Sequence, residues 1–464
     1  MTALDARTRL LLEAPIAPTL ARLAVPNVLV MVAQASAGLI ETYFVGKLGT
    51  DALAGMALVF PIVMLMQMMS SGAIGGGIAS SIARALGGGR REDANAVVVH
   101  ALVIAVAFGV LFTLALWAGG RWLYRQMGGT GAALDAALTY SHWIFAGAVF
   151  VWLLNSLAAV LRGSGNMAVP AKVTVYGVIG LIPLSPLLIF GWGPIPALGI
   201  AGGALALLLY YIVGTLVLVA YLRSPRSLLR LSFAAIRLRA AVFRDILRVG
   251  LISAIGVICT NLAVGVATSL AGHFGSGAIA GYGTASRLEY VLIPLVFGLG
   301  APMLTMVGTC IGAGKRERAL RATWIGAAMA FAITETIGVA AALFPRGWLS
   351  LYGSGATMLQ TGTLYLQTVG PFYGFLGMGL ALYFASQGAG RLLWPICTTV
   401  LRLLIAAGIG IAAIRLGGGL HQVYLAQSAA LLVYGLGTAL AIAGGSMFGA
   451  VGWPRRTADV VVDA

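Results

Sequence analysis

Apolar residues fill this chain in twelve long runs rather than in short alternating stretches. Each run is about 20 residues or longer, which is enough for a helix to cross a hydrocarbon layer of roughly 30 Å. The runs predict helices over residues 22–45, 52–83, 93–118, 132–162, 166–191, 197–222, 246–272, 277–311, 318–344, 356–387, 391–415 and 422–446.

The pattern repeats itself about 225 residues along the chain. Three short motifs recur in the same order, Gly46–Gly55 as Gly272–Gly281, Arg84–Glu92 as Cys310–Glu317, and Gly163–Gly165 as Gly388–Gly390. Each half holds six runs, and an even number makes both halves run through the membrane in the same direction. We therefore predict an all-α polytopic membrane protein with twelve transmembrane helices in two parallel-repeat lobes of six.

The two lobes are predicted at residues 1–222 and 246–464, with a cytoplasmic linker over 223–245. Arginines in and next to this linker alternate with leucines and phenylalanines at helical spacing, a pattern typical of an amphipathic segment on a membrane surface. We interpret it as a connector that also serves as a topology signal. A lipid or regulatory contact is the alternative.

Composition and charge exclude several classes of protein. With 60% hydrophobic residues, 9% charged residues and no alternation of the kind seen in barrels, the chain is neither water-soluble nor a membrane barrel. The net charge of +16 is unevenly placed, because 22 of the 29 lysines and arginines fall in segments on the side of the termini and five on the other. The positive-inside rule therefore predicts a bacterial inner-membrane protein with both termini in the cytoplasm, whose basic residues face anionic lipid rather than nucleic acid.

Several segments together resemble the multidrug and toxic compound extrusion (MATE) family, in its DinF-like prokaryotic branch. They are Glu41–Gly46, Arg84–Ala94, Arg162–Asn166 and Tyr282–Glu289. The resemblance covers nearly the whole chain and implies an antiporter that exchanges H⁺ or Na⁺ for organic, usually cationic, drugs by alternating access. We expect it to work as a monomer.

Two other functions are alternatives to an antiporter for this chain. A flippase for lipid-linked precursors belongs to the same superfamily, but such proteins usually have extra helices and a cationic cavity. An intramembrane enzyme or receptor is disfavoured, since the four histidines lack the spacing of a protease or metal site. The chain also has no phosphate-binding loop. We expect no catalytic residue, metal or cofactor, and an ion gradient as the energy source.

Glu41 is the first candidate for ion coupling. The resemblance implies an acidic residue on the first helix just before the short outer loop, and Glu41 occupies that place. Burial in a low-dielectric cavity would favour the protonated carboxyl, and a drug cation would compete for its charge. An interfacial position near the outer headgroups is the alternative.

The sequence departs from the family pattern at two places. Where DinF-like relatives carry an Asn and an Asp on the fifth helix, this chain has Leu181 and Ser185. The acidic residue that other branches carry on the seventh helix falls at Thr260 or Asn261. One carboxylate suffices for a proton, whereas Na⁺ needs several oxygen ligands, so we expect H⁺ coupling with Na⁺ as the alternative.

Four further ionisable residues lie in the second half. Arg287 and Glu289, two positions apart on the predicted eighth helix, point to nearly opposite sides and cannot simply neutralise each other. They indicate either a cation or substrate site in the carboxy-terminal lobe, with Glu289 as a second ion-coupling residue, or a structural ion pair between helices. For Glu335 and Arg402 we expect a structural bridge or a lipid-interface position.

Polar and aromatic residues complete the candidate site. The predicted substrate pathway consists of Gln34, Tyr43, Asn155, Asn261, Arg287 and Tyr373. Tyr373 belongs to an aromatic run on the tenth helix, and cations are attracted to ring faces. Single amides between membrane helices also form plain inter-helix hydrogen bonds. Pro26 is the predicted hinge of the first helix, with a static kink as the alternative.

Overall fold

The computed structural model describes residues 5–231, 238–445 and 447. They form α-helices joined by turns, one π-helical and one 3-10 segment, and an isolated β-bridge between Trp192 and Ile195. Within these ranges eleven helices are long and apolar enough to cross a membrane, and the bent pair over Gly131–Gly163 brings the number of spans to twelve. The predicted all-α polytopic fold is confirmed.

Internal contacts divide the chain into two compact units. Unit 1 comprises Met1–Arg7 and Leu29–Gly250, and unit 2 comprises Thr8–Val28 and Leu251–Ala464. The first and seventh membrane helices therefore each begin in one unit and continue in the other. This division differs from lobes at 1–222 and 246–464, because the start of each of these two helices packs with the helices of the opposite repeat.

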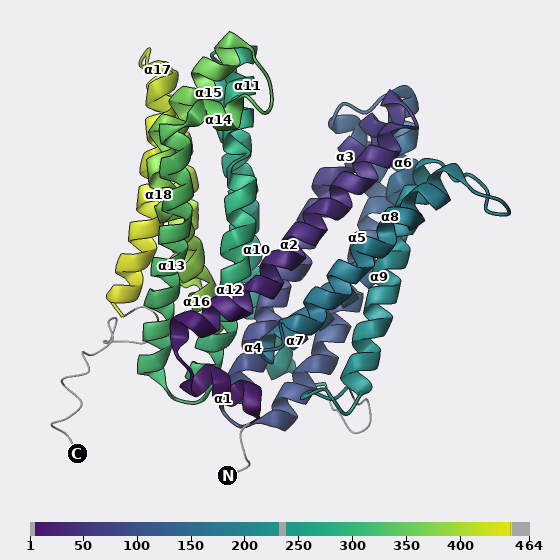
Figure 1. Ribbon diagram of the computed structural model, residues 1–464, viewed down its shortest axis with the longest axis vertical. Coiled ribbons are helices and arrows are strands. Elements are labelled where there is room, and N and C mark those ends of the chain that lie inside the picture. Colours follow the sequence, from purple (N-terminus) through teal and green to yellow (C-terminus); the bar gives the residue numbers. More distant parts are fainter. Residues whose placement is uncertain (1–4, 232–237, 446, 448–464) are drawn as a thin grey trace. The chain divides into compact units, whose positions relative to one another are not determined.

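Unit 1 contains nine helical segments and the first part of a tenth. They are α2 (Ile16–Gly46) from Leu29 onward, α3 (Thr50–Gln67), the π-helix η1 (Met68–Ile74), α4 (Gly75–Gly87), α5 (Arg91–Gln126), α6 (Gly131–Ala146), α7 (Ala148–Gly163), α8 (Ala168–Phe190), α9 (Ile200–Arg223) and α10 (Ala240–Gly272) up to Gly250. Inside the unit α7 packs against α4, α5 and α9, while α3 lies on α6 and α8 lies on α9 (Figure 1).

Unit 2 follows the same plan. From Thr8 onward it contains α1 (Ala6–Glu13), the start of α2, the rest of α10, α11 (Ser276–Ser286), α12 (Glu289–Gly312), α13 (Arg316–Leu343), α14 (Pro345–Leu349), α15 (Ala356–Val369), the 3-10 turn η2 (Gly370–Phe372), α16 (Tyr373–Ala389), α17 (Leu393–Arg415) and α18 (Leu420–Ala443). Here α16 packs against α12, α13 and α18, and α17 lies on α18.

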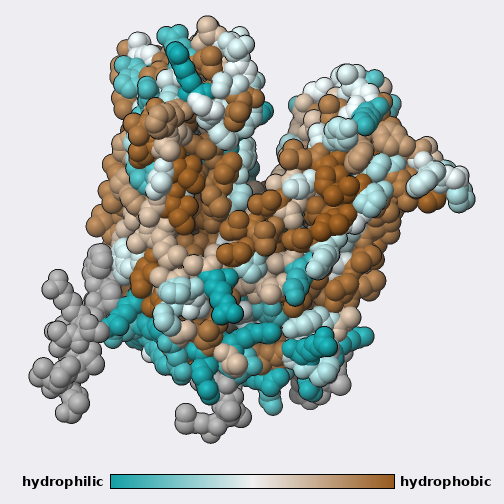
Figure 2. All heavy atoms as spheres, viewed as in Figure 1, coloured by the Kyte–Doolittle hydropathy of each residue, from teal (hydrophilic) through white to brown (hydrophobic). Residues whose placement is uncertain are grey.

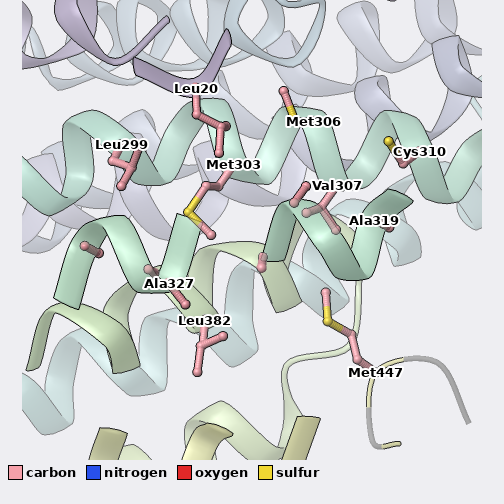
Figure 3. Close-up of a cluster of buried hydrophobic side chains, with 14 of the residues drawn as sticks. Leu20, Leu299, Met303, Met306, Val307, Cys310, Ala319, Ala327, Leu382 and Met447 are labelled. Carbon is pink, nitrogen blue, oxygen red and sulfur yellow. The ribbon is translucent and has the colours of Figure 1, made fainter. Parts of the chain in front are cut away.

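One core cluster of unit 2 consists of buried aliphatic and sulfur-containing side chains. Leu20 of α2, Met303 of α12, Ala327 of α13 and Leu382 of α16 belong to it (Figure 3). On the face shown in Figure 2, apolar side chains cover the middle of the helices and hydrophilic ones gather at helix ends. That distribution is the one expected of helices whose flanks lie in hydrocarbon.

Two spans break where straight helices were predicted. The prediction of one helix over 132–162 is wrong, because α6 and α7 meet at Gly147 with a 48° bend. The predicted helix over 356–387 is interrupted by η2, where Gly370 precedes Pro371, a residue without the N–H that a continuing helix needs. The breaks are repeat counterparts, since residue 147 plus the offset of about 225 is residue 372.

The start of α10 and the residue before it are held in unit 1 by ion pairs and hydrogen bonds. Arg84 of α4 pairs with Asp245 at 2.7 Å, and the Ser81 hydroxyl donates to the same carboxylate at 2.5 Å. Arg239 pairs with Asp93 at 2.9 Å. These contacts explain why α10 belongs to unit 1 as far as Gly250. In the predicted amphipathic linker, residues 224–231 are not helical, and 232–237 lie outside the described residues.

A corresponding attachment holds the end of α1 in unit 2. Arg318 of α13 donates through Nε to the Leu11 carbonyl oxygen at 3.1 Å and also bonds the carbonyl of Ala14. Leu11 and Leu12 are buried in the core cluster of that unit. A guanidinium at the last carbonyls of a helix satisfies acceptors that have no partner in the helix itself.

Close helix packing at one glycine gives a test of unit 1. A Cβ on Gly55 of α3 would lie 2.7 Å from both the Ala136 Cβ and the Ala137 backbone nitrogen of α6. We therefore expect Gly55→Ala to lower the free energy of unfolding by about 1–3 kcal/mol, the usual cost of overpacking, and to lower the thermal midpoint of the purified protein.

The control is Gly180→Ala in α8, where nothing lies within 4 Å of the added Cβ. That variant is expected to unfold at the parent midpoint or slightly above it, since alanine suits a helix better than glycine. Equal midpoints for Gly55→Ala and the parent protein would contradict the packing described for α3 and α6.

Candidate functional site

Glu41 lies near the carboxy-terminal end of α2 and is buried, with 1% of its surface exposed. The Tyr140 hydroxyl of α6 donates to Glu41 Oε1 at 2.8 Å. On α9 a Cβ at Gly203 would come within 3.1 Å of the same oxygen, so the absence of a side chain there leaves room for the carboxyl. Glu41 is thus enclosed by unit 1 rather than exposed on its surface.

The family departures fall on the neighbouring helix α8. Leu181 and Ser185 are both buried, so neither supplies the amide or carboxylate expected of a relative. The Ser185 hydroxyl has no hydrogen-bond partner among the described residues. Within the same residues, Tyr140 is the one side chain that hydrogen-bonds Glu41.

A second polar group lies at the junction of α3 and the π-helix η1. Asn155 Nδ2 of α7 donates to Gln67 Oε1 at 3.0 Å and to the Ser70 hydroxyl at 2.8 Å. Gln67 Nε2 in turn donates to the Tyr211 hydroxyl of α9, which is close enough to Glu41 for an electrostatic interaction. Asn155 therefore forms the inter-helix bonds that were one of its two predicted roles, in a network beside the carboxyl.

Unit 2 holds a second carboxyl in a related setting. Glu289 is the first residue of α12 and is half-buried. Its Oε1 accepts hydrogen bonds from the Tyr365 hydroxyl at 2.9 Å and the Tyr373 hydroxyl at 3.4 Å. The guanidinium of Arg402 on α17 interacts electrostatically with Glu289. This carboxyl, unlike Glu41, has a cationic neighbour.

The two tyrosines that donate to the carboxyls are repeat counterparts. Tyr140 and Tyr365 differ by 225 positions, as do Gly131 and Ala356, the first residues of α6 and α15. The carboxyls themselves come from helices that are not equivalent, the first span in unit 1 and the eighth in unit 2. The same position of the repeat therefore supplies a tyrosine hydroxyl that donates to a carboxyl in each unit.

The other charged candidates take partners of their own. Arg287 lies between α11 and α12, exposed, with its guanidinium carbon 5.1 Å from the Tyr352 ring centroid. Arg287 therefore lies inside the eighth span, Ser276–Gly312, at the short turn that joins its two helical segments. Arg402 stacks over Tyr434 at 5.5 Å, and Glu335 accepts the Gly374 backbone N–H at 2.7 Å. Among the described residues, Glu335 and Arg402 form no ion pair with each other.

The remaining pathway residues are spread over the helices. Tyr43 is 60% exposed and lies under Lys47 Nζ at 4.6 Å. Gln34 is half-buried on α2, and Asn261 is exposed and donates to the Val257 carbonyl at 2.8 Å. Pro26 lies inside α2, two residues before its passage from unit 2 to unit 1 at Val28 and Leu29. Their roles in transport stay predictions.

Sequence reasoning missed Tyr140, and it identified the aromatic run on the tenth helix, to which Tyr365 belongs, without assigning Tyr365 a role. The signal that would have found both is the repeat itself, since the same hydroxyl recurs at an offset of 225. Tyr211 gave no comparable signal, because its position beside Glu41 depends on how α9 packs on its neighbours.

Comparison with known proteins places the chain in a family. The MatE family model matches residues 26–187 and 253–411, one segment in each repeat. An FAD transporter of Shewanella oneidensis is 28% identical over 414 residues, covering 86% of this chain and 89% of that protein. The probable multidrug resistance protein YoeA of Bacillus subtilis is 27% identical over 397 residues, covering 83% of each.

Solved structures agree with the sequence match. A crystal structure of MATE in the bent conformation superposes with a TM-score of 0.86 at 25% identity, covering 94% of this chain and 96% of that chain. A MOP superfamily transporter from Pyrococcus furiosus, described as having a binding pocket of reversed polarity that suggests a different function, gives 0.85 at 25% identity, covering 94% and 97%. The chain therefore belongs to the MatE family, and it is a multi-pass helical membrane protein of the transporter class with small molecules as its substrates.

Proposed function

We propose that this protein is a secondary active antiporter that exports organic cations in exchange for H⁺. The observation that carries the proposal is Glu41, a buried carboxyl with one tyrosine donor and no ion-pair partner among the described residues. An ionised carboxylate out of water is costly unless it is compensated. A proton or a substrate cation can each provide that compensation, and the two compete for one site.

The same competition couples the movement of the proton to the movement of the substrate cation in the opposite direction. A cation that binds Glu41 displaces its proton, and a proton that arrives from the outer side displaces the cation. The coupling then follows from charge alone and needs no nucleotide. We propose H⁺ rather than Na⁺ because the places where the family resemblance implies an amide and a carboxylate are Leu181 and Ser185 here.

Glu289 is proposed as a second ion-coupling residue. The Tyr365 and Tyr373 hydroxyls donate to its carboxyl, and the Arg402 guanidinium interacts with it electrostatically, so a bound ion or substrate would compete with these partners. Alternating access would use the passage of α2 between the units, with Pro26 as the hinge. We also propose the cytoplasmic membrane, cytoplasmic termini and a monomer as the working state.

Export of an anionic dinucleotide is the competing function, since an FAD transporter matches most of the chain. A buried carboxylate without a cationic partner repels such a substrate, and a flippase for anionic lipid-linked precursors meets the same objection. The two classes separate in one assay, because only the proposed function predicts ethidium transport that excess FAD leaves unchanged.

Replacing Glu41 tests the coupling directly. In proteoliposomes with an acidic interior, an antiporter accumulates ethidium as protons leave. Glu41→Gln should abolish this accumulation, because the amide cannot exchange a proton, whereas Glu41→Asp should retain part of it. A sodium gradient of the same size should drive no uptake in the parent protein. Uptake by Glu41→Gln at the parent rate would remove this residue from the mechanism.

Removing the Tyr140 hydroxyl tests how the carboxyl is held. A donor to a carboxylate favours its ionised form, so Tyr140→Phe should move the pH of half-maximal transport upward by about 1 to 2 units, from about 1.5–3 kcal/mol for a hydrogen bond to a charged group.

Tyr43→Phe is the matched control, since Tyr43 is exposed and lies under Lys47. Tyr365→Phe should move the profile less, because Glu289 keeps Tyr373 and Arg402. A Tyr140→Phe profile that coincides with the profile of Tyr43→Phe would show that the hydroxyl does not control the proton.

A further inference from the structure

We infer that Glu335 is a positioning residue for the carboxyl site of unit 2, acting through the break in the tenth membrane span. The inference rests on the proposed role of Glu289. The break creates a helix N-terminus inside the span, since α16 begins at Tyr373 directly after η2. The first N–H groups of a helix have no partner within it, and in a membrane the protein must provide one.

Glu335 provides that partner. Its Oε2 accepts the Gly374 backbone N–H at 2.7 Å, at the second residue of α16. A carboxylate is also favoured at this end of a helix by the helix dipole. A Cβ on Gly374 would lie 2.6 Å from the same Oε2, so the approach of the carboxylate depends on a glycine there.

The residue held by this cap is a donor to Glu289. Tyr373 precedes Gly374, is fully buried, and directs its hydroxyl to Glu289 Oε1 at 3.4 Å. α13 and η2 are packed closely on the same side, because an added Cβ on Gly370 would lie 2.7 Å from the Gly338 carbonyl oxygen. Glu335 therefore fixes the start of α16, and the start of α16 fixes the Tyr373 hydroxyl.

The repeat supports a functional link between cap and hydroxyl. At the equivalent break in unit 1, Ala148 and Val149 occupy the places of Tyr373 and Gly374, 225 positions earlier. That unit holds its carboxyl with one tyrosine. Unit 2 thus has both the second tyrosine and the carboxylate that anchors it, and unit 1 has neither.

The test combines amide exchange with transport in the full-length protein. Glu335→Ala should speed hydrogen–deuterium exchange in peptides containing Gly374 by about tenfold and slow pH-driven ethidium transport by about 3- to 10-fold, the range of one hydrogen bond. Glu335→Gln keeps an acceptor oxygen and should restore both. Thr336→Val is the matched control, because the Thr336 hydroxyl bonds the Ala332 carbonyl of its own helix.

A double variant separates positioning from a general loss of structure. In a Tyr373→Phe background, Glu335→Ala should slow transport no further, since its effect passes through the missing hydroxyl. The inference would be overturned if the double variant lost transport by the product of the two single losses. It would also be overturned if Glu335→Ala left hydrogen–deuterium exchange at Gly374 unchanged. Glu335→Met, which keeps the side-chain bulk, replaces the alanine variant if the latter does not accumulate. The exchange result stands apart from the Glu41 test, so failure of the proposed function is distinguishable from failure of this inference.

Discussion

An ionisable side chain in a membrane helix must obtain its partners from the protein, because hydrocarbon offers none. Glu41 and Glu289 both meet this constraint with a tyrosine hydroxyl from the same repeat position, at 2.8 and 2.9 Å. They differ in charge compensation. Glu289 has Arg402 nearby, whereas Glu41 has a hydroxyl and no ion pair among the described residues. That difference makes the first carboxyl the one suited to exchanging a proton for a cation.

Broken helices allow the constraint to be met. The tyrosine donors lie on α6 and α15, the first segments of spans that are interrupted at Gly147 and at Gly370–Phe372. At Gly147 the helix direction changes by 48°, so the Tyr140 hydroxyl on α6 can be placed independently of how α7 packs. The break also exposes backbone N–H groups, and in unit 2 the Glu335 carboxylate satisfies one of them.

The overall fold could be predicted from the sequence because its cause is local. Apolar runs of sufficient length specify membrane helices, and the recurrence of motifs about 225 residues apart specifies two related halves. The position of Glu41 on the first helix was predicted by the same kind of pattern, together with the family resemblance. The helix breaks were not predicted. Gly147 and the Gly370–Pro371 pair lie at them, but whether a helix ends at such residues depends on what packs there, which is Leu208 at Gly147 and Ala342 at Gly370.

The site contacts could not be predicted in the same way. Tyr140 and Glu41 are 99 residues apart, and their hydrogen bond results from the packing of helices that share no local pattern. For Arg402 the sequence predicted a bridge to Glu335 or a lipid-interface position, whereas the structure places it beside Tyr434 and near Glu289. The division of the chain was also hidden, because attachments such as Arg318 to Leu11 join segments far apart in sequence.

The central claim is that a proton and a substrate cation compete for Glu41. The most direct measurement is proton release when ethidium is added to the purified protein in weakly buffered solution, followed with a pH indicator. By linkage, competition for one carboxyl predicts release approaching one proton for each bound cation at a pH where that group is protonated, and none from a Glu41→Gln protein. Ethidium binding to the parent protein without proton release would contradict the account.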